Sequence, residues 1–184
     1  MAFAFPWHRD VWYIAPRQQL NWSMPIFQVR PDNSMIFDLP SFDQAVPNTS
    51  DTFDYYRNNA QRRTTAASVA KEQQARPAAV DHQPANDLIV LPPPGGILLF
   101  SGAHLHSIPN TSGLARYSID FRTVDARDLV KGSGAPLVDV HCTGTAIRDF
   151  VNIADGTSFD EELVVDPFGA PPDDAMLVFG APQA

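Results

Sequence analysis

Short apolar runs, separated by Pro, Gly, Asn and Asp, make up most of this chain. The runs LNWSMPIFQVR, SMIFDLP and LIVLPPPGGILLFSG predict strands, because aromatic and branched side chains favour strands and Pro and Gly favour turns. The third run predicts two strands joined by a Pro and Gly turn, with a further turn at Gly102. The 17 prolines and 10 glycines lie between such runs and favour a mainly β protein over a helical bundle.

The segment ARYSIDFRT predicts another strand with two different faces, because side chains alternate along a strand. Its polar face holds Arg116, Ser118, Asp120 and Arg122, and its apolar face holds Tyr117, Ile119 and Phe121. The polar face of such a strand usually meets solvent. In a barrel it can instead line the interior, with the apolar face packed beneath another layer.

One long helix is predicted from Thr52 to about residue 75, where Pro and Gly are absent, with Ser50 or Asp51 as its N-cap and Pro77 as its stop. We interpret residues 51–76 as a helical insertion. Its basic residues fit a solvated helix face, the usual case, or a clamp for an anionic substrate. They are Arg62, Arg63, Lys71 and Arg76. Residues 1–150 are expected to form the core, and residues 151–184 an acidic tail rich in Pro and Gly.

Composition narrows the classes of protein. With 184 residues, 44% of them hydrophobic and 18% charged, the chain fits one folded domain. A formal net charge of -8 makes nucleic acid an improbable partner. The sequence has no run long enough to span a membrane and its start lacks a signal pattern, so we expect a cytoplasmic protein with no membrane partner. The single cysteine, Cys142, is expected to be a buried thiol.

Three residues are candidates for a metal site. His8 and Asp10 stand two apart in FPWHRDVWY, where an extended backbone would point both side chains the same way. His106 follows in FSGAHLHSIPNTSGLARYSIDFR. Two imidazoles and one carboxylate can occupy one face of an octahedral metal and leave three positions open, as in non-heme iron(II) oxygenases.

These motifs together resemble a known family. In the second half of the chain, His106 is followed by Pro-Asn and, ten residues after itself, by Arg116-Tyr117-Ser118. With HRDVWY, QLNWSMP, PGGILLFSGAHLHSIPN and RYSIDFRTVDARDL, the chain resembles the iron(II)- and 2-oxoglutarate-dependent dioxygenases over roughly residues 5 to 150. Among them it looks most like bacterial relatives of the phytanoyl-CoA dioxygenase branch.

The resemblance implies both a fold and a function. The fold would be a double-stranded β-helix, a jelly roll of two facing sheets with the metal inside. His8, Asp10 and His106 would bind Fe(II), and Arg116 and Ser118 would hold the distal carboxylate of 2-oxoglutarate. The implied reaction uses dioxygen to hydroxylate a small organic molecule, with succinate and carbon dioxide as coproducts. The sequence does not identify that molecule.

Several alternatives remain open at this point. His104 competes with His106 as a ligand, and a cupin would use His104 and His106 with a glutamate where Asn110 or Thr111 stands. Arg122 is the other candidate for the carboxylate, unless it pairs with Asp120. A jelly-roll module that binds without catalysis is a further alternative.

Other residues near the proposed ligands are candidates for contact with the cosubstrate or for core packing. Gln19 and Asn21 are candidates to reach the cosubstrate, whereas the aromatic residues around His8 are expected to pack in the core. Those aromatic residues are Trp7, Trp12, Tyr13 and Trp22. His82 and His141 have no such context and are expected to be structural or exposed.

The chain departs from the family at its start, where His8 follows only seven residues. Family members carry helices and strands before this motif, so we expect the barrel to be incomplete at its N-terminal end. Because open sheet edges seek partners, we expect a homo-oligomer, a partner chain that completes the barrel, or poor solubility. A stable monodisperse monomer in sedimentation would contradict this expectation.

Overall fold

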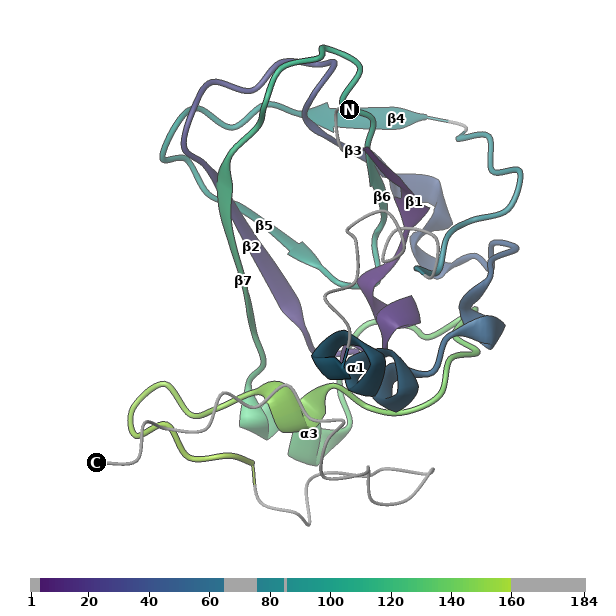
Figure 1. Ribbon diagram of the computed structural model, residues 1–184, viewed down its shortest axis with the longest axis vertical. Helices are drawn as coiled ribbons and strands as arrows, with labels where there is room; N and C mark the ends of the chain where they lie inside the picture. Colours follow the sequence, from purple (N-terminus) through teal and green to yellow (C-terminus); the bar gives the residue numbers. More distant parts are fainter. Residues whose placement is uncertain (1–3, 65–75, 85, 160–184) are drawn as a thin grey trace.

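A computed structural model of the protein describes residues 4–64, 76–84 and 86–159, and it consists mainly of two facing antiparallel sheets (Figure 1). One sheet has the order β1-β6-β3-β4 and the other the order β5-β2-β7. The strands are β1 (Phe5–His8), β2 (Leu20–Pro25), β3 (Met35–Asp38), β4 (Asp87–Val90), β5 (Leu98–Ser101), β6 (Leu105–Ile108) and β7 (Ser118–Thr123).

The chain crosses from one sheet to the other after β1, β2, β4, β5 and β6, and only β3 and β4 follow each other within a sheet. This alternation between two antiparallel sheets is that of a jelly roll. The predicted fold class is therefore confirmed. The Pro and Gly turn between residues 91 and 97 joins β4 to β5, but these strands lie in different sheets and do not pair with each other.

Strand β2, in the middle of the second sheet, turns polar side chains inward. In β2 the buried residues are Asn21, Ser23 and Pro25, while Leu20 at its start is exposed and Trp22 and Met24 between them are half-buried. On the outer face Trp22 stacks on Phe121 of β7, with ring centroids 5.5 Å apart. A sheet that faced solvent only on its outside would show the reverse alternation, so the interior of this jelly roll is built to hold polar groups.

One apolar cluster packs between the two sheets, and a second lies at the end of β1. Phe37 of β3 meets Phe100 of β5 edge to face between the sheets, at a centroid distance of 5.1 Å. Trp12 is fully buried against Leu105 and Val46 at the end of β1, in agreement with the expected core role of that aromatic residue. The two clusters lie on either side of His106, so the strand that carries it, β6, is buried along its whole length.

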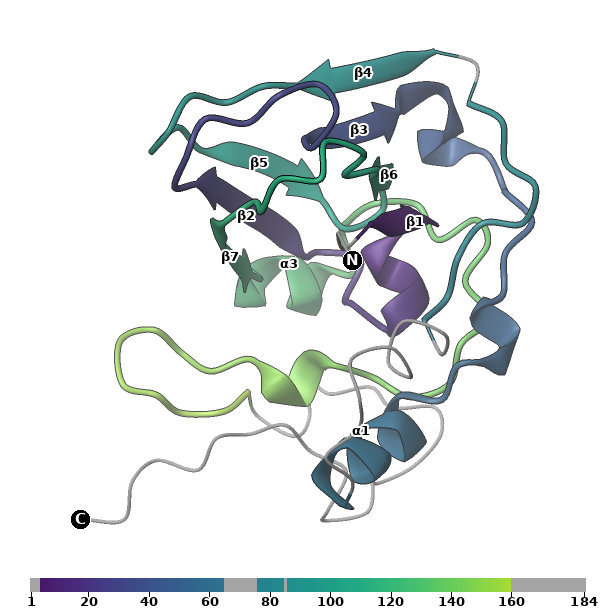
Figure 2. The same cartoon turned by 45° about the horizontal axis from the view of Figure 1, so that its top comes forward.

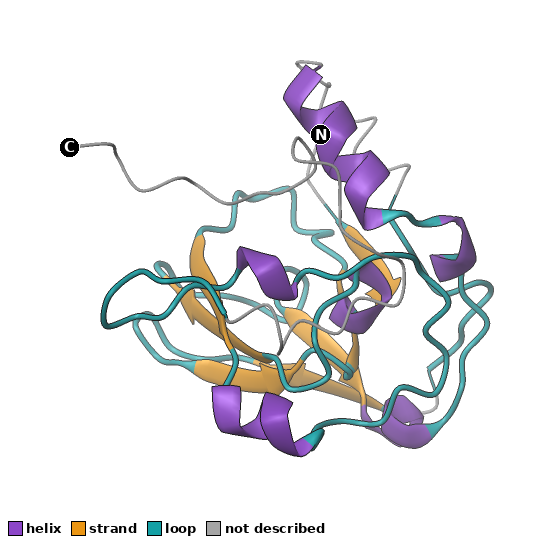
Figure 3. Ribbon diagram, turned by 90° about the horizontal axis from the view of Figure 1, so that it is seen from below, coloured by secondary structure: helices purple, strands orange, loops and turns teal. Residues whose placement is uncertain are grey.

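The helices lie around the strands (Figure 3). Helix α1 (Tyr55–Thr64) lies near the end of β1 and away from β4 (Figures 1 and 2). The expected N-cap at Ser50 or Asp51 is wrong: both belong to a separate 3₁₀ turn, because Phe53 interrupts the helix to enter the core. Asp54 supplies the cap instead, its carboxylate accepting the backbone N–H of Arg57 at 3.0 Å. The rest of the predicted helix, residues 65–75, lies outside the described residues.

The segment after β7 contains a short helix and a closed turn. A short helix, α3 (Ala126–Lys131), begins at Asp125, whose side chain accepts the N–H of Arg127. Of the predicted tail, residues 151–159 form a turn closed by the bridge between Val151 and Ser158, and the remainder lies outside the described residues. None of the described helices has the length and apolarity needed to cross a membrane.

Candidate metal centre

Strand pairing brings the two candidate histidines together. His8 ends β1 and His106 lies in β6, and the antiparallel register sets them directly opposite each other. Their ring centroids are 4.2 Å apart. Asp10 starts the 3₁₀ turn that follows β1, and its Oδ1 lies 3.7 Å from Nε2 of His8 and 3.8 Å from Nε2 of His106. One donor atom from each of the three residues lies within 4.8 Å of the others.

Hydrogen bonds fix which nitrogen each histidine presents. Nδ1 of His8 contacts the carbonyl oxygen of Pro6 at 2.8 Å, and Nδ1 of His106 contacts that of His104 at 2.9 Å. A carbonyl oxygen only accepts, so Nδ1 carries the proton in both rings and Nε2 keeps its lone pair. Burial lowers the pKa of both histidines below 6.5 and favours the neutral, metal-binding form.

Side-chain amides hold the third member of the cluster. Asn21 of β2 donates to Oδ2 of Asp10 at 2.8 Å, and Gln19 donates to Oδ1 of Asn21 at 2.7 Å. Nε of Arg122 lies 3.8 Å from the same Oδ2. Oδ1 of Asp10 is thereby directed towards the histidines. Gln19 and Asn21, which were candidates to reach a cosubstrate, are both hydrogen-bonded to Asp10.

The turn between β5 and β6 also approaches Asp10 closely. A Cβ atom added to Gly102 would lie 3.3 Å from the Cβ of Asp10, and the carbonyl of Gly102 accepts the N–H of Val11 at 3.2 Å. Any larger residue at this position would press on the carboxylate. The turn predicted at Gly102 thus brings β6 and its histidine next to the Asp10 segment.

A buried ion pair anchors the residue between the two N-terminal ligands. The side chain of Arg9 points away from the cluster and donates to Asp139 at 3.1 Å and to the carbonyl oxygen of Ala103 at 2.5 Å. Asp139 also accepts the indole N–H of Trp12 at 2.8 Å. Sequence reasoning missed both charges. For Asp139 a signal was present, since it stands between Val138 and Val140 and would need a buried partner. Arg9 is flanked by polar residues and gives no such signal.

Beside the cluster, the interior of the jelly roll contains a cavity of about 130 Å³. Arg116, Asp120 and Arg122 line it together with the three candidate ligands. Ser118 does not line it; its hydroxyl donates to Asp120 at 2.6 Å. Asp120 also attracts Arg116, although burial lowers the pKa of that guanidinium overall. The structure thus places Arg116 in this cavity with Asp120, while Arg122 lies nearer to Asp10.

His104 does not join the cluster in the described part of the chain. It precedes β6, so the alternation that would have aligned it with His106 does not apply, and its ring packs 4.6 Å from that of Phe42. Its backbone carbonyl, in contrast, orients His106. The cupin ligand pair of His104 and His106 is therefore absent among the described residues. His82 pairs with the buried carboxylate of Asp38 at 2.9 Å.

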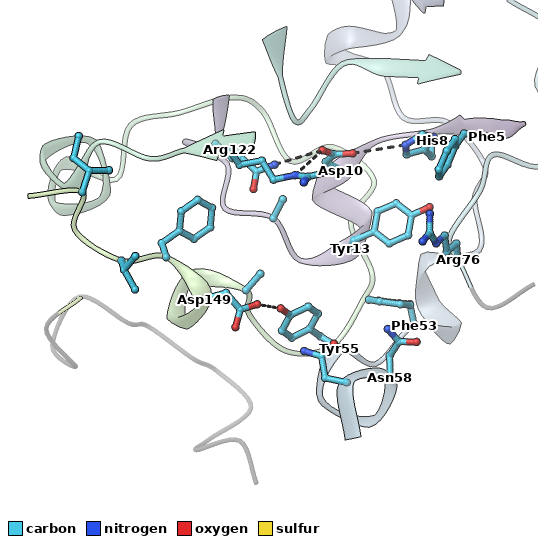
Figure 4. A pocket seen from close by; sticks show the side chains of 17 residues that line it. Phe5, His8, Asp10, Tyr13, Phe53, Tyr55, Asn58, Arg76, Arg122 and Asp149 are labelled. Carbon is cyan, nitrogen blue, oxygen red and sulfur yellow. Dashed lines mark hydrogen bonds and ion pairs between the residues drawn. The ribbon is translucent and has the colours of Figure 1, made fainter. Parts of the chain in front are cut away.

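A larger cavity, of about 680 Å³, also reaches His8 and Asp10 (Figure 4). Tyr13, Phe53 and Tyr55 form much of its wall, and Arg76 enters it beside Phe5 and Tyr13. The candidate cluster thus adjoins two cavities of different size, both of which are lined by His8, Asp10 and Arg122.

No protein-family model and no curated protein matches the chain. Among solved structures, EvdO2 from Micromonospora carbonacea var. aurantiaca, complexed with 2-oxoglutarate, is 14% identical; the match covers 68% of this chain and 49% of that one, with a TM-score of 0.45. Apo ThoJ, a non-heme monooxygenase, is 17% identical; the match covers 68% of this chain and 41% of that one, with a TM-score of 0.44. EvdMO1 is 19% identical; the match covers 67% of this chain and 24% of that one, with a TM-score of 0.37.

The chain spans less than half the length of each of these proteins. Because the TM-scores are below 0.5, no property of this protein is inferred from them. None of the three carries the name of a phytanoyl-CoA dioxygenase, so that branch stays a prediction.

Proposed function

We propose that this protein is an iron(II)- and 2-oxoglutarate-dependent oxygenase that hydroxylates a small organic molecule. The observation that carries the proposal is the convergence of the two free Nε2 atoms and one carboxylate oxygen within 4.8 Å. Hydrogen bonds from outside the cluster orient each of the three donors. Such support is typical of metal ligands, whose outer partners set ligand orientation.

The donor set fits Fe(II). Two neutral imidazoles and one carboxylate provide three ligands of mixed hardness and leave three positions of an octahedral ion open. The carboxylate offsets part of the charge of the ion, and the two histidines need not lose a proton to bind it. Iron(II) bound there would supply the centre at which dioxygen is activated, with 2-oxoglutarate consumed as the cosubstrate.

The smaller cavity supports a role in holding 2-oxoglutarate. Arg116 would bind its distal carboxylate, because a guanidinium forms paired, charge-assisted hydrogen bonds with a carboxylate. Arg122 lies close to Oδ2 of Asp10 and lines the same cavity, so it adds positive charge beside the candidate ligands. For Ser118 to join Arg116, as the resemblance implies, its hydroxyl must exchange Asp120 for the cosubstrate.

Asp120 also favours a second candidate function. An acidic side chain in the cavity offsets the charge of Arg116 and already accepts the hydroxyl of Ser118. Of the two groups proposed for 2-oxoglutarate, Ser118 is therefore hydrogen-bonded within the protein, and Arg116 is attracted to Asp120. A module that binds a metal and a small molecule without turning over 2-oxoglutarate would have this arrangement.

Anaerobic titration with iron(II) and 2-oxoglutarate tests the proposal. The chelate of the two gives a weak visible charge-transfer band, and admission of air should then release succinate. His106→Ala should abolish the band, whereas His141→Ala, which removes an exposed histidine outside the cluster, should retain it. Metal binding without a band or succinate would favour the non-catalytic module, and a complete lack of metal binding would exclude both functions.

A further inference from the structure

The cavity of about 680 Å³ falls within the range typical of small-molecule sites. Because it reaches His8 and Asp10, a molecule bound in it lies beside the candidate metal ligands. Its volume is several times that of the interior cavity, which suits it to a larger ligand than a five-carbon cosubstrate. Figure 4 shows the labelled side chains converging on it from β1, α1 and the segment around Asp149.

Aromatic rings make up much of its wall. Tyr13 packs edge to face against His8 at a centroid distance of 5.7 Å and against Phe53 at 5.6 Å. Phe5 and Phe150 also line the cavity. Rings of this kind present flat apolar surfaces, which favour an apolar ligand body over a sugar or a polar amino acid.

One charged group in the wall has no charged partner among the described residues. The guanidinium of Arg76 lies 5.3 Å above the ring of Phe5, and no described carboxylate lies within ion-pair distance of it. The two acids that line the cavity are engaged elsewhere. Asp149 accepts a hydrogen bond from the hydroxyl of Tyr55, and Asp10 is directed towards the histidines and Asn21.

A buried amide supplies a second polar feature. Asn59 is fully buried and lines the cavity, and in the described part of the chain neither its side-chain nitrogen nor its oxygen has a hydrogen-bond partner. Buried polar atoms without partners are rare in folded proteins, because each costs free energy. A ligand carboxylate, or a water held between it and the amide, would satisfy the donor.

We infer that this cavity binds an apolar organic acid, with Arg76 binding the carboxylate and the aromatic wall binding the hydrocarbon body. Calling this acid a substrate rests on the proposed function, whereas the inference that the acid binds in this cavity does not. An acid held by Arg76 has its apolar body beside His8 and Asp10, where a carbon–hydrogen bond would be exposed to the metal centre. A guanidinium binds carboxylate and phosphate groups in the same way, so the test includes both.

Calorimetric titration of the metal-free full chain with 3-phenylpropionate, its neutral amide and phenethyl phosphate tests this inference. The acid should bind about tenfold to a hundredfold more tightly than the amide, since a charge-assisted hydrogen bond contributes that much. Arg76→Ala should remove the preference, while Arg57→Ala, which removes an exposed arginine of α1, should keep it. Arg76→Gln serves if the alanine variant does not fold, which circular dichroism would reveal.

Equal affinity for acid and amide, or absence of binding of both, would overturn the inference. So would displacement of 3-phenylpropionate by equimolar 2-oxoglutarate, because Arg76 would then serve the cosubstrate. Tighter binding of phenethyl phosphate than of 3-phenylpropionate would overturn the assignment of a carboxylate and indicate that Arg76 binds a phosphate group. These readouts need no iron, so a missing charge-transfer band would refute the proposed function and leave this inference standing.

Discussion

His8 and His106 face each other across an antiparallel strand pair, 4.2 Å apart between ring centroids. Strand register alone brings them together, although 98 positions separate them along the chain. A shift of one residue between β1 and β6 would turn one of the rings to the other face of the sheet. The candidate site therefore depends on the correct pairing of these two strands.

Removing the amide that holds Asp10 should weaken metal binding. Asn21→Ala deletes the 2.8 Å hydrogen bond to Oδ2 of Asp10 and leaves the carboxylate free to rotate away from the histidines. Loss of such outer support typically costs about 10- to 100-fold in metal affinity. Competition for Fe(II) with a chromophoric chelator measures the change. Ser23→Ala, on the same strand face without contact to Asp10, is the control, and an equal loss in both variants would contradict a specific role.

The position of Arg116 predicts separate effects on cosubstrate and metal. Arg116→Ala should weaken 2-oxoglutarate binding about 10- to 100-fold, as expected for a lost charge-assisted pair, and should leave Fe(II) affinity nearly unchanged. The intensity of the charge-transfer band at increasing 2-oxoglutarate measures the first, and chelator competition the second. Arg30→Ala removes an exposed arginine outside the cavity and serves as the control. Parallel loss of both affinities would assign Arg116 a structural role.

Asp120 should oppose the same binding step. Asp120→Asn removes the negative charge from the smaller cavity and replaces the charge-assisted hydrogen bond from Ser118 by a weaker one to a neutral amide oxygen. We expect tighter binding of 2-oxoglutarate in this variant, by several-fold to about tenfold, because one unfavourable charge pair disappears. The same titration of the band checks it. A weaker affinity would show that Asp120 orients Arg116 rather than competing for it.

The buried thiol predicts a loss of stability in alkali. Burial raises the pKa of Cys142 from 9.0 to about 11, and its thiol donates to the carbonyl of Val11. The folded state therefore holds its proton more tightly than the unfolded state, so this contribution is complete below pH 9 and is lost as the pH rises towards 11. Urea unfolding should show a slope steeper by at most about 1.4 kcal/mol per pH unit than in Cys142→Ala. Identical slopes would refute the raised pKa.

Much of the fold could be predicted because strand alternation and turn residues are local signals. The strand at residues 118–123 was recognised from its two faces, and Asp120 and Arg122 of its polar face line the smaller cavity, although both residues are exposed. Which face is covered is a property of the whole molecule. The apolar face is not covered by the described residues, since Tyr117, Ile119 and Phe121 are each about half exposed. The expected covering layer is therefore absent from the described part of the chain.

The candidate ligands could be chosen from spacing, but their supports could not. Spacing suggested His8 and Asp10 on one extended strand, whereas Asp10 lies in a 3₁₀ turn and is held by Asn21 of another sheet. Arg76 was assigned to a solvated helix face or an anion clamp. It lies in the wall of a cavity because the chain returns to β1 there, where Ala79 donates its N–H to the carbonyl of Trp7. Contacts between distant segments decide such roles.

The pair of Arg9 and Asp139 should be essential for stability. Both side chains are almost fully buried, and Asp139 is the only described carboxylate within ion-pair distance of Arg9. Asp139→Ala would leave a buried guanidinium without its counter-charge, which typically costs about 3–5 kcal/mol. Urea unfolding at neutral pH measures the change, with Asp51→Ala, an exposed acid, as the control.

A double variant, Arg9→Met with Asp139→Leu, separates the effect of charge from the effect of shape, because it replaces both charged side chains by apolar ones. If it regains most of the stability, the loss in Asp139→Ala arises from the uncompensated charge, whereas no recovery would assign it to the hydrogen bonds that Asp139 accepts from Trp12 and Val46.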